Sequence, residues 1–221
     1  MEEFTRSMGQ LMSTNLTGDK QRTLFAYVLD DGTKRGRNKD LGWAFLEQTL
    51  DKEPGKALVK FYCFPSDCGE DGDTVVFKVD TATGTRQEVE RIKDGEVDSD
   101  LLYDHDGIAR VAYSSNQDGT PKMSYRPTAT SAWTPLPKSI AGYEIDGGVF
   151  AIDNNTLYAR VSDKGEATQL YKVDLAAGTR EKIMGNDDVE ISGILSGGHD
   201  RIPFGITYTA HKPSVQYFDQ A

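Results

Sequence analysis

The chain of 221 residues has no long hydrophobic run and is poor in basic residues. No stretch approaches the roughly 18 apolar residues that a membrane-spanning helix needs, which excludes that class of protein. The 25 lysines and arginines are outnumbered by 35 aspartates and glutamates, which gives a net charge of -10. Because such a chain repels phosphate groups, we expect neither nucleic acid nor an anionic membrane surface as a partner.

Cysteine and histidine are also scarce, with two cysteines and three histidines. Two cysteines cannot form a disulfide framework, and no histidine lies near enough in the sequence to complete a local zinc site. We expect Cys63 in a strand and Cys68 in a loop, both as free thiols, with a local disulfide across the turn as the alternative. The sequence contains no cofactor motif, so we predict neither a cofactor nor a metal.

The N-terminus, MEEFTRSMGQ, lacks the basic and then apolar pattern of an export signal. This favours a cytoplasmic protein, although a removed signal and a fragment of a longer chain are open alternatives. Residues 1–21 show no periodicity, and we interpret them as a polar tail or arm. Residues 22–221 are predicted to form the folded part.

Short apolar-alternating runs, bounded by glycine, aspartate, asparagine and proline, make up most of the remaining sequence. Runs of this length and spacing indicate an all-β fold. The segment Trp43–Leu50 is the only one that resembles a helix, and its lack of a cap favours a strand or a single turn.

An internal repeat is the strongest feature of the sequence. Phe77-Lys-Val-Asp-Thr-Ala-Thr-Gly-Thr-Arg86 recurs as Tyr171-Lys-Val-Asp-Leu-Ala-Ala-Gly-Thr-Arg180, an offset of 94 residues. The register continues without a gap, since His105-Asp106 matches His199-Asp200. Half this offset leads to a degenerate third copy at residues 121–136, so the basic period is about 47 residues. Four strands in such a period are typical of a β-propeller.

The repeat divides the chain into about four blades of four antiparallel strands. The expected strands are Leu41–Glu47, Ala57–Cys63, Thr74–Asp80 and Thr85–Glu90; Glu96–Tyr103, Ile108–Tyr113, Lys122–Arg126 and Trp133–Pro137; Tyr143–Phe150, Thr156–Val161, Thr168–Asp174 and Thr179–Met184; and Val189–Leu195, Ile202–Thr209 and Ser214–Phe218. The last blade lacks an outer strand, and residues 22–30 stand alone as one strand. The chain is therefore predicted to begin and end inside a blade.

The polar residues of the repeat are explained by turn chemistry. Asp80 and Asp174 open the turns before the outer strands, where an aspartate side chain accepts backbone N–H groups. His105, His199 and His211 also fall in predicted turns. Asp104-His-Asp-Gly107 and Asp71-Gly-Asp73 resemble pieces of calcium loops, but they lack the further ligands that such a loop needs. We therefore predict no catalytic, cofactor-binding or metal-binding residue among them.

The tyrosines at positions 103, 113, 125, 158, 171, 208 and 217 fall on expected strands. Packing between the sheets of neighbouring blades explains them, because alternation does not place them all on one exposed face. Trp133 is expected to pack at the start of an outer strand.

Several of these motifs resemble the prolyl oligopeptidase family of serine peptidases. The segment Leu170-Tyr-Lys-Val-Asp-Leu-Ala-Ala-Gly-Thr-Arg180, its continuation Val189–Leu195, and Ile206-Thr-Tyr-Thr-Ala-His-Lys-Pro213 are similar to the N-terminal propeller of dipeptidyl- or acylaminoacyl-peptidase-like members from bacteria. The resemblance covers roughly residues 40–221. It implies a propeller that restricts access to a following α/β-hydrolase domain, and a periplasmic location if the chain is part of an exported peptidase.

The family's catalytic pattern is absent from this sequence. No Gly-x-Ser-x-Gly nucleophile elbow exists, and Gly193-Ile-Leu-Ser196-Gly-Gly198 has the wrong spacing. The predicted function is therefore a non-catalytic, substrate-gating propeller, with a stand-alone scaffold that binds proteins or ligands as the alternative. The expected partners are a hydrolase domain if the native chain is longer, peptides, and further copies of the chain through blade edges.

Two arrangements would satisfy the incomplete last blade. In the favoured one, the blades form an open arc that buries its faces against another copy or against further blades. In the alternative, residues 22–30 supply the missing outer strand beside residues 214–218 and close a ring of four blades. An exposed sheet edge invites either solution, because its backbone N–H and C=O groups are unpaired.

Overall fold

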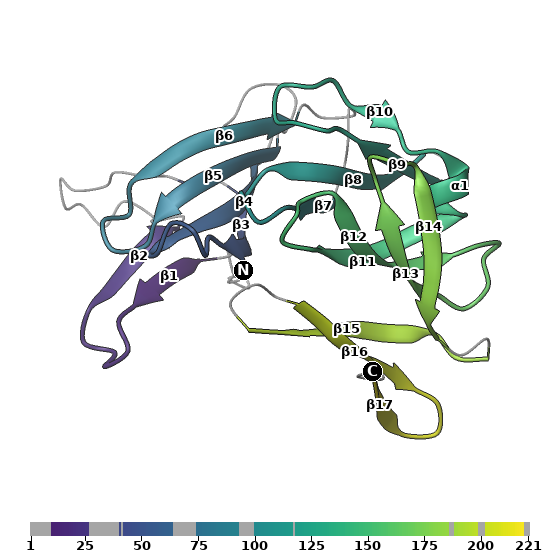
Figure 1. Ribbon diagram of the computed structural model, residues 1–221. Coiled ribbons are helices and arrows are strands. Elements are labelled where there is room, and N and C mark those ends of the chain that lie inside the picture. Colours follow the sequence, from purple (N-terminus) through teal and green to yellow (C-terminus); the bar gives the residue numbers. More distant parts are fainter. Residues whose placement is uncertain are drawn as a thin grey trace, which may run out of the picture. The chain divides into compact units, whose positions relative to one another are not determined.

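The computed structural model describes residues 10–26, 40, 42–63, 74–92, 100–116, 118–185, 188–198 and 202–218. The chain divides into two compact units, Met1–Asp98 and Ser99–Ala221, which we describe separately. Nearly all regular structure in the described residues is antiparallel β-sheet, which confirms the all-β class (Figure 1). The helices of the described part do not include one long and apolar enough to cross a bilayer.

The first unit contains a hairpin and a four-stranded sheet. The hairpin pairs β1 (Leu11–Thr14) with β2 (Gln21–Phe25). The sheet has the order β3-β4-β5-β6 and consists of β3 (Gly42–Thr49), β4 (Lys56–Cys63), β5 (Thr74–Asp80) and β6 (Arg86–Ile92). Alternate residues of β4 are buried on one face, and Leu24 and Phe25 of the hairpin pack against that face beside Val59 and Phe61.

This hairpin corrects one expectation about the N-terminal region and adds a strand to another part of it. Residues 1–21 were interpreted as a polar tail or arm, and β1 lies within them. Residues 22–30 were predicted to stand alone, yet β2 pairs with β1, and within the described part of the chain the neighbour of β17 is β16. Residues 27–30 lie outside the described residues.

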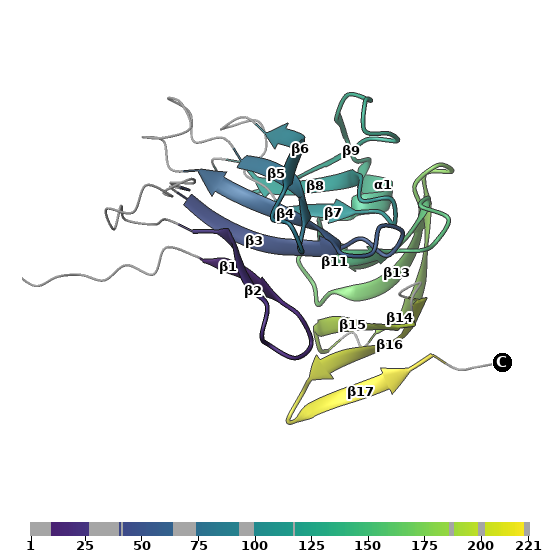
Figure 2. The same ribbon diagram turned by 90° about the vertical axis from the view of Figure 1, so that its left-hand side faces the viewer.

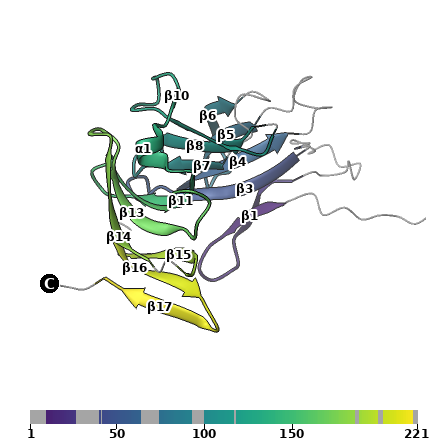
Figure 3. The ribbon, with the colours of Figure 1, turned by 90° about the vertical axis from the view of Figure 1, so that its right-hand side faces the viewer.

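The second unit contains three sheets in sequence order. They are β7 (Asp100–Tyr103), β8 (Ala109–Ser115), β9 (Pro121–Tyr125) and β10 (Thr134–Pro135); β11 (Glu144–Phe150), β12 (Thr156–Ser162), β13 (Gln169–Asp174) and β14 (Thr179–Met184); and β15 (Ile191–Gly197), β16 (Ile202–Thr209) and β17 (Pro213–Tyr217). In each sheet every strand pairs with the next one in the chain. The first strand of the middle sheet, β11, contacts both β7 and β15, so the β11–β14 sheet lies between the other two (Figure 3).

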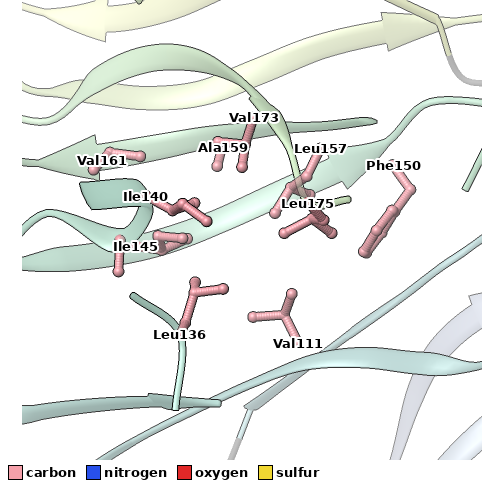
Figure 4. Packing of buried hydrophobic residues seen from close by; sticks show 11 residues of the cluster. Val111, Leu136, Ile140, Ile145, Phe150, Leu157, Ala159, Val161, Val173 and Leu175 are labelled. Carbon is pink, nitrogen blue, oxygen red and sulfur yellow. The ribbon is translucent and has the colours of Figure 1, made fainter. Parts of the chain in front are cut away.

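Apolar faces hold adjacent sheets of this unit together. Leu157, Ala159 and Val161 alternate along β12 and are buried against Val111 and Leu136 of the preceding sheet (Figure 4). On the opposite side, a second cluster joins the same sheet to the next one through Leu170, Ile191 and Ile206, with Tyr158, Met184, Ile194, Tyr208 and Phe218 around them. Face-to-face stacking of successive sheets is the packing expected of propeller blades.

A single turn of helix, α1 (Lys138–Ala141), connects β10 to β11 and was not predicted. It follows Pro137, whose carbonyl accepts the N–H groups of Ile140 and Ala141. Gly142 ends it with φ +64°, and a Cβ atom there would lie 2.5 Å from the carbonyl oxygen of Ser162. Only glycine fits a backbone that turns this way at such close approach.

The strands agree with the sequence-based boundaries within a few residues. Thr74–Asp80, Thr179–Met184 and Ile202–Thr209 match as predicted, and the helix-like segment at residues 43–50 lies almost entirely in the strand β3, Gly42–Thr49. Cys63, which is 1% exposed, is disulfide-bonded in the structure, so the prediction of two free thiols is wrong. Cys68 lies outside the described residues.

Candidate functional site

His105 is part of a contact between two turns of the second unit. Its Nε2 donates to the carbonyl oxygen of Phe150 at 2.9 Å, and its backbone N–H donates to Oδ1 of Asn154 at 2.9 Å. The Asn154 amide in turn donates to Asp106 at 2.8 Å. These bonds join the β7–β8 turn to the β11–β12 turn of the next sheet. His105 therefore has a structural role in a turn, as predicted.

Asn154 is the partner that sequence reasoning missed. It is the one described non-glycine residue with positive φ, at +57°. Asparagine tolerates this conformation better than most residues, and here it also supplies both a donor and an acceptor. The pair Asn154-Asn155 was visible in the sequence only as a turn signal. His211 lies in the bend between β16 and β17, and His199 lies outside the described residues.

The aspartates of the repeat turns accept backbone N–H groups. Asp80 Oδ1 accepts from Ala82 and Thr83, at 3.0 and 2.8 Å, and Asp174 Oδ1 accepts from Ala176 and Ala177 at the same two distances. The hydrogen bond from the Thr83 backbone lowers the pKa of Asp80. These contacts show that both aspartates accept backbone N–H groups in their turns, as predicted.

Asp104 belongs to a buried polar cluster with Arg110. It accepts from the N–H groups of Asp106 and Ile108 and forms an ion pair with Arg110 at 3.0 Å, and both side chains are under 10% exposed. Arg110 also donates to the carbonyl of Arg126, and Arg126 donates to the carbonyl of Ala109. Burial lowers the pKa of Arg110, but its bonds to Tyr125 and Asp104 outweigh this and raise it.

Within the described residues, no group of three or more histidines, cysteines, aspartates or glutamates could hold a metal ion. Asp71-Gly-Asp73 lies outside these residues. The Trp133 ring lies just before β10, as predicted, and the Arg126 guanidinium stacks on it at 4.4 Å from the ring centre.

The arginines that end the two repeat copies occupy similar sites, which sequence reasoning did not assign. Arg86 pairs with Asp40 at 2.8 Å, donates to the carbonyl of Leu24, and covers the Phe25 ring at 3.6 Å. Arg180 pairs with Asp163, donates to the carbonyl of Ile140 at 3.3 Å, and covers the Tyr171 ring at 4.5 Å. The only sequence signal was the identity of the two positions.

Two exposed carboxylates lie on β11, the first strand of its sheet, and one of them is close to Arg160 of β12. The ladder between β11 and β12 is interrupted between Ile145 and Gly148, so Asp146 and Gly147 form a bulge. Gly147 has φ +85°, and a Cβ atom there would lie 3.1 Å from the Arg160 guanidinium. The bulge therefore brings β11 close to Arg160 and aims Asp146 at it, with an ion-pair distance of 3.2 Å.

Arg160 also forms hydrogen bonds to β15, the first strand of the next sheet. Its Nη1 donates to the carbonyl oxygens of Ile191 and Ser192, at 3.2 and 2.9 Å. Glu144, Asp146, Arg160 and Ser192 together form what we call the inner-strand surface. The Arg160 side chain is 19% exposed and that of Asp146 is 51% exposed, so the carboxylates rather than the guanidinium face solvent. Such a surface can bind an ammonium group or backbone N–H groups, but it contains no nucleophile and base in contact.

Comparison with known proteins supports the fold and leaves the family open. No protein-family model matches the sequence, and no curated protein matches it either. Among solved structures, TolB from Acinetobacter baumannii is similar, with a TM-score of 0.56 and 14% identity over 95% of this chain and 46% of that chain. The β-propeller domain of the Trilobed protease from Pyrococcus furiosus has a TM-score of 0.40 and 11% identity, over 80% and 58% of the two chains.

The chain therefore has a β-propeller fold, in which three described antiparallel sheets have four strands and one has three, with a sequence repeat of about 47 residues. It spans about half the length of the TolB structure. At this level of identity the likeness establishes the fold alone, since unrelated functions share the same fold.

Proposed function

We propose that this chain is the non-catalytic propeller of a prolyl oligopeptidase-type serine peptidase, and that it restricts the access of substrates to a hydrolase domain. The observation that carries the proposal is the family-like segment Leu170–Arg180, which lies on the β13–β14 hairpin of a complete blade. The resemblance around it extends over roughly residues 40–221.

The contact of His105 supports a role without catalysis for this residue. The Nε2 of His105 is occupied by the carbonyl of Phe150, and a serine peptidase needs a histidine nitrogen that contacts the nucleophile. Ser196 lies on β15, a strand, whereas a nucleophile elbow requires a sharp turn between a strand and a helix. A gate needs neither group, because it acts by excluding large substrates.

The charge of the inner-strand surface suggests which charged peptides the propeller admits more readily. Glu144 is exposed and Asp146 is half exposed, so cationic groups are attracted there and anionic groups are repelled. Rigid blades exclude folded proteins, and the surface charge adds a preference among the peptides that pass.

The test is to express the chain alone and the longer chain encoded by its gene beyond Ala221. The proposal expects a Gly-x-Ser-x-Gly hydrolase domain downstream, hydrolysis of short peptides by the longer chain, and none by the 221 residues alone. Hydrolysis by this chain that survives rigorous purification would refute the non-catalytic role. A gene that ends without a hydrolase domain would refute gating.

Charge reversal tests the surface in the longer chain. Glu144→Lys should raise KM for peptides with a cationic end several-fold while kcat stays unchanged, because it changes the attraction of the peptide and not the reacting groups. Glu181→Lys is the matched control, since Glu181 is exposed on the outer strand β14. Equal effects of the two substitutions would show that net charge, and not the inner-strand surface, is responsible.

An exposed aromatic pair in the first unit favours a second candidate, a propeller that binds a partner. Trp43 on β3 is 44% exposed and stacks on Tyr62 at 6.1 Å, and Phe45 on the same strand is 50% exposed. Such rings bind apolar side chains readily. Titration with peptides, followed by the fluorescence of Trp43, separates the two roles. A scaffold should bind peptides saturably at these rings, and Phe45→Ala should weaken that binding. A gate should show no saturable binding at Trp43.

A further inference from the structure

Arg160 lies near the centre of β12, on the face of the β11–β14 sheet that packs against the last sheet. Tyr158, two positions before it, packs against the cluster that joins these two sheets, and alternate residues of a strand share a face. Figure 2 shows the β15–β17 sheet beneath the β11–β14 sheet, and β11 contacts β15. The side chain of Arg160 is therefore within reach of acceptors on both sheets.

Backbone carbonyls of the last sheet hold the Arg160 guanidinium in place. Its Nη1 donates to the carbonyl oxygens of Ile191 and Ser192, whose positions are fixed by β15. Its Nη2 lies 3.2 Å from Oδ2 of Asp146, on the side of β11. Because a guanidinium has five N–H donors, it binds the two carbonyls and the carboxylate at the same time. The position of the positive charge is therefore set by β15 as well as by its ion pair.

The bulge on β11 gives the guanidinium the space that it needs. Gly147 has φ +85°, and a Cβ atom there would lie 3.1 Å from Nη2 of Arg160. A side chain at this position would press on the guanidinium, and it would also strain the backbone, since residues other than glycine rarely adopt such a φ. The glycine thus allows the cation to lie beside Asp146.

Arg160 changes the net charge of the inner-strand surface. The carboxylates of Glu144 and Asp146 carry two negative charges, and the guanidinium cancels one of them, which leaves a net charge of -1. The attraction that an ion pair exerts falls off faster with distance than that of a single charge, because its two Coulomb contributions oppose each other. A cation that approaches this surface is therefore attracted chiefly by Glu144.

We propose that Arg160 is a specificity-determining residue of the inner-strand surface, and that it acts by compensating the charge of Asp146. It keeps the attraction of cationic peptides close to that of Glu144 alone, so that neutral peptides are admitted as well. The choice of peptides as ligands rests on the proposed function, whereas the compensation depends only on the contacts that Arg160 makes with Asp146 and β15.

Titration of the 221-residue chain with N-acetyl-lysine amide at low salt, followed by the amide chemical shifts of β11, tests the proposal. This probe carries a single positive charge, and N-acetyl-norleucine amide is its neutral counterpart. Arg160→Gln should lower the dissociation constant of the cationic probe about threefold, which corresponds to one unit charge at roughly 6 Å in water. The neutral probe should bind the variant no more tightly, and added salt should reduce the gain for the cationic one.

Further variants separate the charge of Arg160 from its structural role. Arg160→Lys keeps the charge but loses the forked hydrogen bonding, so it should lower stability in urea and yet leave the dissociation constant of the cationic probe unchanged. Lys212→Gln is the matched control, since Lys212 is exposed in the bend between β16 and β17, and it should not change the affinity. Arg160→Met is a second neutral variant if the glutamine variant does not fold. A gain in affinity with Arg160→Lys or Lys212→Gln, or none with a folded neutral variant, would overturn the proposal.

The longer chain encoded by the gene shows whether Arg160 also sets selectivity during turnover. There Arg160→Gln should lower KM for peptides with a cationic end about threefold, while kcat and the KM for neutral peptides stay unchanged. Equal changes in KM for cationic and neutral peptides would contradict a role in specificity. The titration needs no hydrolase domain, so the charge compensation and the gating function can fail separately.

Discussion

The two copies of the repeat end in the same arginine, but the two arginines are held differently. Arg86 makes a two-pronged contact with Asp40, in which both side chains are less than 20% exposed, and it lies 3.6 Å from the centre of the fully buried Phe25 ring. Arg180 contacts one oxygen of Asp163, which is 38% exposed, and lies 4.5 Å from the half-buried Tyr171 ring. The arginine of the first unit therefore lies in a less solvent-exposed site than the arginine of the second unit.

The partners of the two arginines also come from different parts of the chain. Asp40 lies just before β3, whereas Asp163 follows β12, and the two residues are not equivalent in the repeat. The aromatic rings differ as well, since Phe25 comes from the separate β1–β2 hairpin and Tyr171 from β13, which neighbours the arginine's own strand. Both copies of the repeat contain the arginine that donates the hydrogen bonds, whereas the groups that accept them come from different positions in each unit.

Arg86→Ala should cause the largest loss. It leaves Asp40 partly buried without its cation and removes the cover of Phe25, so we expect a loss of about 3 kcal/mol in the free energy of unfolding. Urea unfolding followed by the fluorescence of Trp43, in a Trp133→Phe background, measures it near the affected sheet.

Arg91→Ala is the control for this loss, because the Arg91–Glu88 pair is more than 40% exposed on both sides and lies on the same strand, β6. An exposed pair of this kind contributes little. If the two substitutions cost the same, the burial of Arg86 is not what stabilises the first unit.

Arg180→Ala should cost less, about 1 kcal/mol, because the Asp163 it leaves is largely hydrated. The fluorescence of Trp133 in a Trp43→Phe background reports it within the second unit. A loss equal to that of Arg86→Ala would mean that stacking on the ring, and not the ion pair, dominates at both sites.

The contrast between the two arginines shows which features could be predicted from the sequence and which could not. Period and alternation predicted the strands of the complete blades, since both depend on local pattern and turn residues. Asp80 and Asp174 were assigned correctly for the same reason: an aspartate that accepts N–H groups two and three residues ahead acts locally. Partners that are distant in sequence were not predicted.

Three features show why the other parts of the fold and of the candidate site could not be predicted from the sequence. The strand β1 is four residues long and its alternation is too short to detect, so the region appeared to be a tail. The Asn154 contact with His105 spans 49 residues, and Arg160 reaches Ser192 across 32. The bulge at Asp146-Gly147 depends on how β11 pairs with β12, which no local pattern specifies.

Substitution of the two turn aspartates should lower the stability of the protein equally, in contrast to substitution of the two arginines. Asp80→Ala and Asp174→Ala each remove an acceptor of two backbone N–H groups at the same distances. We expect the two substitutions to lower the melting temperature by the same small amount, a few degrees. Asp→Asn at either position keeps the acceptor and should recover most of the loss. Unequal effects in calorimetry would show that the two hairpins are not equivalent.

The smallest expected effect is the pH dependence of Arg180→Ala. The hydrogen bond from Arg180, aided by the Tyr171 hydroxyl, holds the pKa of Asp163 below its ordinary value. A carboxyl whose pKa is lower in the folded state contributes stability that is present above the unfolded-state pKa, near 4, and is lost as pH falls through the folded-state value. Below that value Asp163 is protonated with or without Arg180. The cost of Arg180→Ala should therefore be greater at pH 7 than at pH 2 to 3, and urea unfolding at both pH values measures the difference. In an Asp163→Asn background the cost should not change with pH. A cost that changes equally in that background would assign the dependence to another carboxyl.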